Sequence, residues 1–280
     1  DRGIYNTILA DGPAGLRLIP HFVVDADGKM VSSGNPLEDA FNKNEIEVPE
    51  GGTEYFQYCT AIPVAALLAQ SWNMDLIQKC GDIVGKEMEE FHISVWLAPG
   101  MNIHRNPLCG RNFEYYSEDG YLSGCVAVAE IAAVRKLGII PYMKHFVLND
   151  SETDRARGIC TWSTEQAIRE IYLKQFEIIV KEAHPYTIMS SYNLINGIHA
   201  SENKELLTGI LRDEWGFDGL VTTDWWTFGE HYRETKAGND IKMAAGYPER
   251  IKEAYEKGFI TEAEIRLSAR RILNMILKID

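Results

Sequence analysis

A carboxylate followed directly by two indoles is the feature of this sequence with the clearest chemical potential. Asp224 ends the apolar run that starts after Gly219, and Trp225 and Trp226 come immediately after it. Such a pair suits a sugar ring, because the acid can attack or stabilise the anomeric carbon while the apolar ring face rests on an indole. The alternative is that Asp224 caps the next turn and the tryptophans belong to the core. Taken alone, this stretch leaves both interpretations open.

Basic side chains elsewhere could bind the hydroxyls of such a substrate. Lys144 and His145 follow a short apolar run and place a cation beside an imidazole. Arg111 and Arg155 lie in polar loops, where a guanidinium fork can hold two hydroxyls or orient a carboxylate. For the two arginines a structural salt bridge is the alternative. For Lys144 and His145, side chains alternate along a strand, so the alternative is that one of them faces the core or only pairs with a nearby acid.

Three further residues extend this candidate set. Asp11 is held by the Gly/Pro turn of the stretch DGPAGLR and can accept hydrogen bonds from two hydroxyls. Tyr192 follows another apolar run and can donate to the free oxygen of Asp224, and Met189 in the same run is expected to form a wall. The alternatives are an ordinary turn aspartate and a core tyrosine.

Composition argues against several other kinds of site. The seven histidines include no HxH or HxxxH pair, so we predict no metal site, and we expect no cofactor. A net charge of -13 argues against a nucleic-acid partner, and no apolar run is long enough to cross a membrane. The five scattered cysteines contain no CxxC pair and predict neither a disulfide framework nor a zinc site. They favour a reducing compartment, with a mild preference for the cytoplasm.

Short apolar runs that predict strands alternate with helical patterns along the chain. The runs cover residues 93–98, 139–143, 186–190 and 219–223, with shorter segments before residue 11 and at 241–243. At least four strand-helix units in a row imply parallel strands joined by helical crossovers. We therefore predict an α/β fold in which residues 1–280 form one (β/α)8 TIM-like barrel.

Helices are predicted between these strands. Their patterns cover residues 63–88, 123–137, 163–180, 206–215, 230–237, a segment from 249, and 261–277. We expect the first pattern to break near Gly81. The clearest helix is predicted to begin at Ser163 with Gln166 in a capping box, and the last to be capped by Thr261 and Glu264.

The candidate residues share one position relative to the predicted strands. Those at or just past the carboxyl end of a strand are Asp11, Arg111, Lys144, His145, Tyr192 and Asp224. In a parallel barrel these ends form a single rim, so residues remote in sequence would converge on one pocket. A chance arrangement would scatter them between both rims. The coincidence favours Asp224 as a site residue over the turn-capping alternative.

Five longer motifs resemble the catalytic barrel of the glycoside hydrolase family 3 β-glucosidases. They are DGPAGLR at 11–17, NPLCGRNFEYYSEDGYLSG at 106–124, KHFVLNDSETDR at 144–155, MSSYNLING at 189–197 and GFDGLVTTDWW at 216–226. Several linked motifs in the right order are far more specific than any one of them. The resemblance implies exo-acting, retaining hydrolysis of terminal β-linked glucosyl residues.

The resemblance also implies roles for individual residues. Asp224 matches the nucleophile, and Trp225 matches an aromatic residue that flanks the substrate. The matches to the sugar-binding residues are Asp11, Arg111, Lys144, His145, Arg155 and Tyr192, with Arg17 as a less certain member and Met189 lining the same subsite.

This chain departs from the family pattern at three places. Trp226 stands where a small residue is frequent after the tryptophan, and its indole can reshape the entrance. Gly120 stands where a proline is frequent. The loop KHFVLNDSETD lacks the second histidine that serves as the general acid in the single-domain N-acetylglucosaminidase branch, so we do not expect that activity.

A retaining glycosidase needs a second carboxyl, about 5 Å from the nucleophile, to protonate the leaving oxygen. The carboxyls in the predicted rim loops are Glu114, Glu118, Asp119, Asp150, Glu152 and Asp154. The resemblance implies instead a glutamate from a companion α/β sandwich domain outside this chain. The sequence opens at Asp1 without an initiator Met, and we expect a piece of a longer polypeptide whose barrel is incomplete at the amino end.

Two other functions stay open at this point. One is β-xylosidase or arabinofuranosidase activity within the same family, which depends on the size of the pocket around the exocyclic carbon of the sugar. The other is a non-catalytic sugar-binding barrel, because no acid is certain. The expected partners are a β-glucoside or oligosaccharide and the companion domain. Linkage specificity and homo-oligomerisation stay open. Residues 24–53 are polar and aperiodic and predict a long loop.

Overall fold

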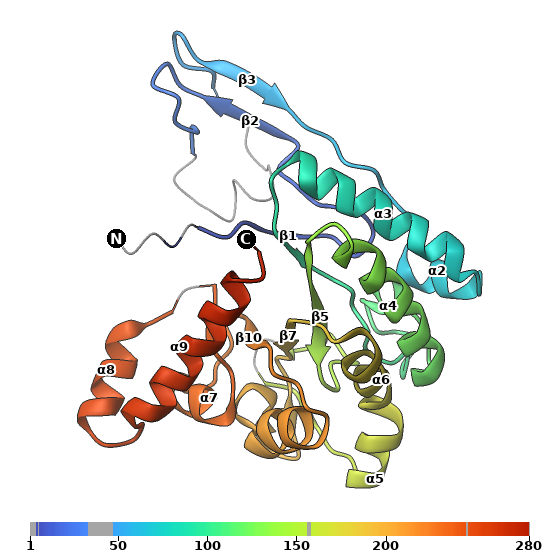
Figure 1. Ribbon diagram of the computed structural model, residues 1–280, viewed down its shortest axis with the longest axis vertical. Coiled ribbons are helices and arrows are strands. Elements are labelled where there is room, and N and C mark those ends of the chain that lie inside the picture. The colour runs from blue at the N-terminus through green and yellow to red at the C-terminus, as the bar shows by residue number, and fades with distance from the viewer. Residues whose placement is uncertain (1–3, 5, 33–46, 156–157, 245, 280) are drawn as a thin grey trace.

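A six-stranded parallel sheet forms the centre of the molecule, as seen in a computed structural model that describes residues 4, 6–32, 47–155, 158–244 and 246–279 (Figure 1). In spatial order its strands are β1 (Leu9–Asp11), β4 (Val95–Leu97), β5 (Ile140–Phe146), β7 (Thr187–Ser190), β10 (Leu220–Trp225) and β11 (Ile241–Met243). Each neighbouring pair is parallel. The predicted strands and their parallel arrangement are therefore confirmed.

Helices connect these strands. They are α2 (Ala65–Gln70), α3 (Met74–Glu90), η1 (Asn112–Glu114), α4 (Gly120–Arg135), α5 (Glu165–Ala167), η3 (Ile168–Tyr172), α6 (Lys174–Ala183), η4 (Ala200–Glu202), η5 (Glu205–Glu214), α7 (His231–Ala237), α8 (Pro248–Glu256) and α9 (Glu262–Ile276). Two small sheets complete the fold. One pairs β2 (His21–Val24) with β3 (Thr53–Phe56), and the other joins β6 (Cys160–Thr161), β8 (Leu194–Ile195) and β9 (Ile198–His199).

The sheet is apolar on both faces because helices cover both. Its outer face presents buried side chains such as Trp96, Met143, Ile188 and Val221 to a cluster shared with α3, α4 and α6. These helices lie on one side of the strands in Figure 1, and α9 lies on the other. A strand buried on both faces reads as a continuous apolar run, which is why these strands are recognisable in the sequence.

The TIM-like barrel, predicted to be incomplete at the amino end, is confirmed in its coarser form, because the sheet of the described residues curls into a half-barrel. It has six strands there and does not close into a ring of eight. Its inner face carries Leu97, Tyr142 and Leu220, which form a second buried cluster with Met275 of α9. Ile272 and Ile276 pack against the same cluster, so one stripe of α9 faces the inside of the sheet. The apolar inner surface is thus covered by a helix where a closed barrel would cover it with more strands.

The break predicted near Gly81 lies elsewhere. Residues 71–73 separate α2 from α3, where Asn73 caps α3 by accepting from the Leu76 amide at 3.1 Å. Gly81 lies inside α3, and a Cβ at this position would come within 2.8 Å of the Ala133 Cβ on α4. This glycine therefore permits close packing of two helices and does not end one.

The N-cap predicted at Ser163 lies one residue later, and Gln166 forms no capping box. Thr164 is the N-cap, and its side chain accepts from the Ala167 amide at 3.2 Å. The predicted helix is also divided, because the wider turn η3 separates α5 from α6. The capping box of α9 by Thr261 and Glu264 is confirmed.

The predicted loop at 24–53 lies partly outside the described residues, which omit 33–46, and its two ends adjoin the paired strands β2 and β3. The helix predicted from residue 123 begins earlier, at Gly120, because Asp119 caps it through the amides of Tyr121 and Leu122. The five cysteines are free thiols. No helix in the described ranges has the length and apolarity needed to span a bilayer.

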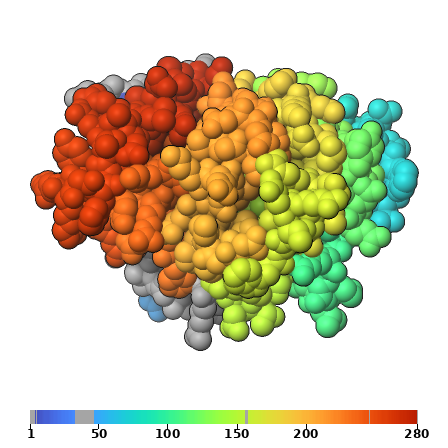
Figure 2. Space-filling model, turned by 90° about the horizontal axis from the view of Figure 1, so that it is seen from below, coloured from blue at the N-terminus to red at the C-terminus, as the bar shows by residue number. Residues whose placement is uncertain are grey.

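The carboxyl ends of the central strands point downward in Figure 1, and Figure 2 views the molecule from that side. The segment that follows β5, coloured yellow-green, lies on this face beside the orange segments that follow β7 and β10 (Figure 2). The strand order therefore brings segments far apart in sequence onto one surface.

Candidate active site

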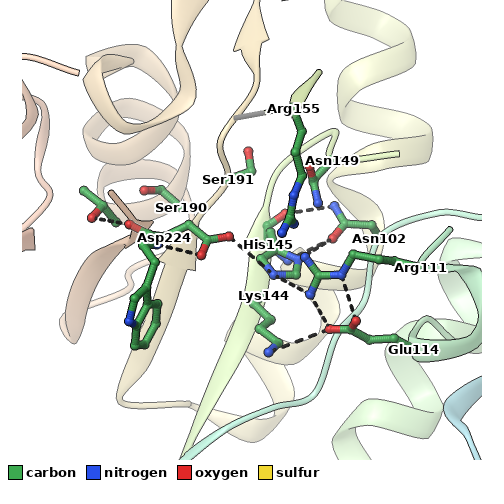
Figure 3. A network of polar contacts seen from close by, with 12 residues as sticks. Asn102, Arg111, Glu114, Lys144, His145, Asn149, Arg155, Ser190, Ser191 and Asp224 are labelled. Atoms are coloured by element: carbon green, nitrogen blue, oxygen red, sulfur yellow. Dashed lines mark hydrogen bonds and ion pairs between the residues drawn. The ribbon is translucent and has the colours of Figure 1, made fainter. Parts of the chain in front are cut away.

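Side chains from β1, β5 and β10 meet at one end of the sheet. Asp224 of β10 points towards His145 of β5, and Arg111, Glu114 and Lys144 lie on the other side of the imidazole (Figure 3). The expectation that these residues share one rim is confirmed as a spatial arrangement. Their roles stay predictions.

Asp11, at the end of β1, holds the ammonium of Lys144. The Lys144 Nζ donates to the Asp11 Oδ1 at 2.6 Å, and Arg17 pairs with the other carboxylate oxygen. Burial alone would raise the pKa of Asp11, but Lys144 and Arg17 hold it below its usual value. The Arg17 side chain is 67% exposed, so it borders this cluster and is not enclosed by it.

Arg111 is held rigidly by a carboxylate. Its Nε and Nη2 donate to Glu114 at 2.8 and 2.6 Å, which is the bidentate geometry that fixes a guanidinium plane. Lys144 lies 3.7 Å from the same carboxylate. The salt-bridge alternative is therefore correct for the contacts of Arg111, yet the pair still places the guanidinium against His145.

The partners of His145 assign its tautomer. Arginine can only donate, so the contact of 3.0 Å from the Arg111 Nη2 makes the His145 Nε2 an acceptor without a proton. The proton then lies on Nδ1, which is 3.2 Å from both the Asn102 Oδ1 and the Tyr115 hydroxyl. Burial, followed by the charges of Arg111, Lys144 and Arg155, keeps the pKa of His145 well below its ordinary value.

Lys144 and His145 both reach the cluster, although they are neighbours on one strand. The pairing of β5 with β7 shifts register between Met143 and Phe146, so regular alternation is interrupted there. Lys144 and His145 are 4% and 2% exposed. Both side chains therefore contact polar groups of the cluster, and Lys144 pairs with the acid Asp11, as one of the alternatives expected.

Asp224 is the carboxylate with a free oxygen at the centre of this cluster. Its Oδ1 accepts from the Trp225 amide at 2.7 Å, whereas Oδ2 has no hydrogen-bond partner in the described part of the chain. The His145 Nε2 lies 3.6 Å from Oδ2 but carries no proton in the assigned tautomer. Burial raises the pKa of Asp224, and the Trp225 amide and surrounding cations oppose this.

Arg155 and Tyr192 close another side of the cluster. The Arg155 guanidinium lies 4.8 Å from the centre of the Tyr192 ring, and its Nε forms an ion pair with the Glu152 Oε2 at 2.9 Å. The Arg155 Nη1 is buried and has no partner among the described residues. Burial and the charge of Asp224 raise the pKa of the Tyr192 phenol. Two polar groups thus stand near Asp224 with capacity to bind a ligand.

Met189 and the tryptophans occupy different surroundings. Met189 is 2% exposed and belongs to the inner apolar cluster, against which Trp225 also packs. Trp226 is 51% exposed, as expected for an indole at an entrance. Met189 is therefore a core residue of the inner cluster, and its role as a wall of the sugar subsite stays a prediction.

Sequence reasoning missed three residues that orient His145 or its neighbours. Asn102 donates from Nδ2 to the His145 carbonyl at 2.9 Å and accepts from the His145 amide at 2.9 Å. Tyr115 contacts the imidazole, and Asn149 donates to the Tyr115 hydroxyl at 3.2 Å. All three are buried. Their only sequence signal is a polar residue in a loop that follows a predicted strand, and many other residues share it.

The carboxyls considered as a general acid have varied surroundings. Glu118 and Asp154 are exposed, and Asp119 caps α4. Glu114 faces Arg111 and Lys144, which suits an anion that holds cations. Burial raises the pKa of Glu152 despite Arg155 beside it. Asp150 is buried and lines a different cavity.

A cavity of about 440 Å³ adjoins the cluster and is bordered by Asp11, Arg17, Tyr58 and Glu114. Its volume exceeds that of one sugar ring. Within the described residues, no three His, Cys, Asp or Glu side chains gather as metal ligands would.

Comparison with known proteins gives the following matches. Residues 44–275 match the model of the "Glycosyl hydrolase family 3 N terminal domain". The chain is 46% identical over 255 residues to "Beta-glucosidase A" of Butyrivibrio fibrisolvens. It is 39% identical over 278 residues to the "Exo-alpha-(1->6)-L-arabinopyranosidase" of Bifidobacterium longum. These alignments cover 91% and 99% of the chain.

Solved structures give the same result. The β-glucosidase 3B of Thermotoga neapolitana in complex with α-D-glucose superimposes with a TM-score of 0.82 at 39% identity, over 97% of this chain and 35% of that one. The β-glucosidase of Kluyveromyces marxianus in complex with glucose gives 0.83 at 31% identity, over 99% and 30%. The chain spans only 27% of the Butyrivibrio relative and 33% of the Bifidobacterium relative.

Proposed function

The chain belongs to glycosyl hydrolase family 3, and from this premise we propose that it is the sugar-binding part of a retaining β-glucosidase with Asp224 as its nucleophile. The observation that carries the proposal is the Oδ2 of Asp224, which is buried among groups that bind hydroxyls and has no hydrogen-bond partner among the described residues. A carboxylate can attack an anomeric carbon only through an oxygen that no other donor occupies. The β-glucosidases among its relatives support a glucosyl substrate.

The surrounding residues support a division of roles. Lys144 is held by Asp11 and Glu114 and Arg111 by Glu114, so their remaining hydrogens are directed by fixed geometry at a bound sugar. Arg155 and Tyr192 supply further donors beside Asp224. Asp224 attacks the anomeric carbon and forms a glycosyl-enzyme, and water then releases the sugar. The acid that protonates the leaving oxygen is a glutamate of a companion domain outside this chain.

The direct test replaces Asp224 with alanine in the full-length protein. We expect hydrolysis of an aryl β-glucoside to fall by about 10³-fold or more, because the covalent step is lost. Asp218→Ala is the matched control, since Asp218 is an exposed carboxylate only six residues away. It should leave the rate nearly unchanged. An Asp224→Ala enzyme within about tenfold of wild type would contradict the role of this residue.

A second experiment identifies the nucleophile chemically. A 2-deoxy-2-fluoroglucoside with a good leaving group slows release of the glycosyl-enzyme, so mass spectrometry should find the label on the peptide that contains Asp224. Label on another carboxylate would reject the assignment. Binding of glucose without turnover by the full-length protein would instead support the non-catalytic sugar-binding alternative.

Hydrolysis of a pentoside is a second candidate function. It is favoured by the Bifidobacterium relative, whose name specifies an arabinopyranosidase and which aligns with 99% of this chain. Rates on paired aryl β-glucoside, β-xyloside and α-L-arabinoside substrates decide between them. A kcat/KM for either pentoside above that for the glucoside would make the pentoside the substrate.

A further inference from the structure

A second cavity, separate in its lining from the one beside Asp11, opens along the segment between β5 and α5. Its volume is about 420 Å³, and it is lined by Arg105, Asp150, Ser151, Cys160, Thr161 and Trp162, among others. None of these residues makes a contact described above for Asp224. The segment that lines it lies on the face shown in Figure 2.

Asp150 is the unusual group in this cavity. It is 5% exposed, and no donor among the described residues makes a well-formed hydrogen bond to either carboxylate oxygen, although the Ile103 amide lies close enough to stabilise the charge. Burial raises its pKa to about 7, although the charge of Arg105 and the amide of Ile103 oppose this. A buried carboxyl with so few donors among the described residues costs free energy, and a ligand that supplies further donors would lower that cost.

The walls of the cavity indicate the chemical class of that ligand. Trp162 is 71% exposed and offers an indole face, while Ser151 and Thr161 carry hydroxyls. The Arg105 guanidinium is 5.9 Å from the centre of the Tyr172 ring, so it is anchored on one side. An aromatic face beside acceptors is how proteins bind a ring with one apolar face and several hydroxyls. A metal ion is not favoured, because no cluster of ligating side chains is found within the described ranges.

We propose that this cavity is a second carbohydrate subsite that holds one pyranose ring, with Trp162 against the ring face and Asp150 accepting from its hydroxyls. The choice of a sugar rests on the proposed function, whereas the cavity and its buried carboxyl do not. The cluster around Asp224 and the second cavity are joined by consecutive residues. Asn149 donates to Tyr115 in that cluster, and Asp150 lines the second cavity. The subsite therefore lies next to the candidate active site along the chain.

Fluorine NMR of the full-length protein labelled with 5-fluorotryptophan tests this proposal at each indole separately. Trp162 reports the second subsite, Trp226 reports the entrance near Asp224, and Trp72, which is 73% exposed and remote in sequence, reports non-specific effects. Substitution of each tryptophan by phenylalanine assigns its resonance. The probe is methyl β-D-thioglucopyranoside, chosen because its sulfur linkage resists hydrolysis.

We expect the Trp162 resonance to shift saturably while that of Trp72 does not. Asp150→Ala should weaken this binding by about tenfold or more, since hydrogen bonds to a carboxylate are lost, and Asp150→Asn, which keeps the shape, should weaken it by about threefold or more. Both variants should leave the Trp226 titration intact, which also shows that they are folded. Asp218→Ala is the surface control and should change neither titration.

The outcomes separate this proposal from the proposed function. A Trp162 resonance that moves no more than Trp72, while Trp226 responds, overturns the second subsite alone. A response at Trp162 without one at Trp226 supports the second subsite and counts against sugar binding beside Asp224. An unchanged Trp162 titration in both Asp150 variants overturns the role given to this carboxyl.

Discussion

At the scale of single residues, the hydrogen-bonding state of His145 decides how Asp224 is presented. The imidazole lies between Arg111, which can only donate, and Asn102, whose Oδ1 accepts. This leaves the His145 Nε2 without a proton to give to Asp224, 3.6 Å away. The nucleophilic oxygen proposed here is therefore free because a residue on the far side of the ring, Asn102, fixes the tautomer.

Replacing Asn102 with aspartate tests this relation. A carboxylate beside Nδ1 favours the imidazolium and raises the pKa of His145, which burial and three cations now hold well below its ordinary value. As pH falls, the His145 Nε2 of the variant gains a proton. The resulting imidazolium repels the Arg111 guanidinium and pairs with the Asp224 carboxylate. We expect kcat/KM of the variant relative to wild type to fall progressively from about pH 8 to about pH 5, and the pH profile measures this.

Asn203→Asp is the matched control for that profile. Asn203 precedes η5 and accepts from the Leu206 amide at 3.0 Å, a bond that aspartate also accepts, and it is not among the hydrogen-bond partners of His145 described above. The kcat/KM of Asn203→Asp relative to wild type should not change with pH. A flat ratio for Asn102→Asp as well would mean that Asn102 does not control the state of His145.

At the scale of elements, close helix packing sets the position of the strands that carry the site. α3 and α4 approach so closely that only glycine fits at position 81, where a Cβ would also lie 3.1 Å from the Glu130 carbonyl. α4 leads directly into β5, the strand of Lys144 and His145. Gly81, which the sequence pattern predicts as a helix break, is thus a packing residue. The apolar period of a helix does not reveal how close a neighbouring helix lies.

A pair of glycine substitutions separates packing from helix propensity. Gly81→Ala should destabilise the protein by about 1–3 kcal/mol, because the added methyl group meets the Ala133 Cβ. Gly209→Ala in η5 meets nothing within 4 Å and should be neutral or stabilise by up to about 1 kcal/mol. Urea unfolding of both variants measures the difference. Equal effects at the two positions would contradict the packing explanation.

At the scale of the whole molecule, the half-barrel depends on α9. The inner faces of the strands are apolar, and a sheet of six strands leaves them open on one side. Met275 fills this space, and Arg271 ties the helix to Asp240 at 3.2 Å. Asp240 also accepts from Arg212 at 3.0 Å, so one buried carboxylate joins α9 to η5. The last helix therefore supports the sheet from inside.

Truncating one buried side chain of α9 tests this role. Met275 is 7% exposed, and Met275→Ala should cost about 2–5 kcal/mol, because it leaves a void against the inner cluster. Leu277→Ala, two residues on, removes a side chain that is 70% exposed and should cost less than about 0.5 kcal/mol. Thermal unfolding of the two variants provides the comparison. A small loss for Met275→Ala would show that α9 does not seal the sheet.

Local patterns in the sequence determined the identity and order of the parallel strands, the capping of α9, and the set of residues at strand ends. These features depend on apolar period and on neighbours a few residues apart, which the sequence displays directly. The five linked motifs determined the family, because each motif is a local pattern that the sequence also displays directly.

Only the tertiary structure decided how the sheet closes and which polar groups touch. The bond from Lys144 to Asp11 joins residues 133 positions apart, and the free oxygen of Asp224 depends on Asn102 through His145. The filling of the inner face by α9 and the burial of Asp150 are likewise products of packing. A side chain's partners depend on distances between remote segments, and these arise only when the sheet has curled and its helices have docked.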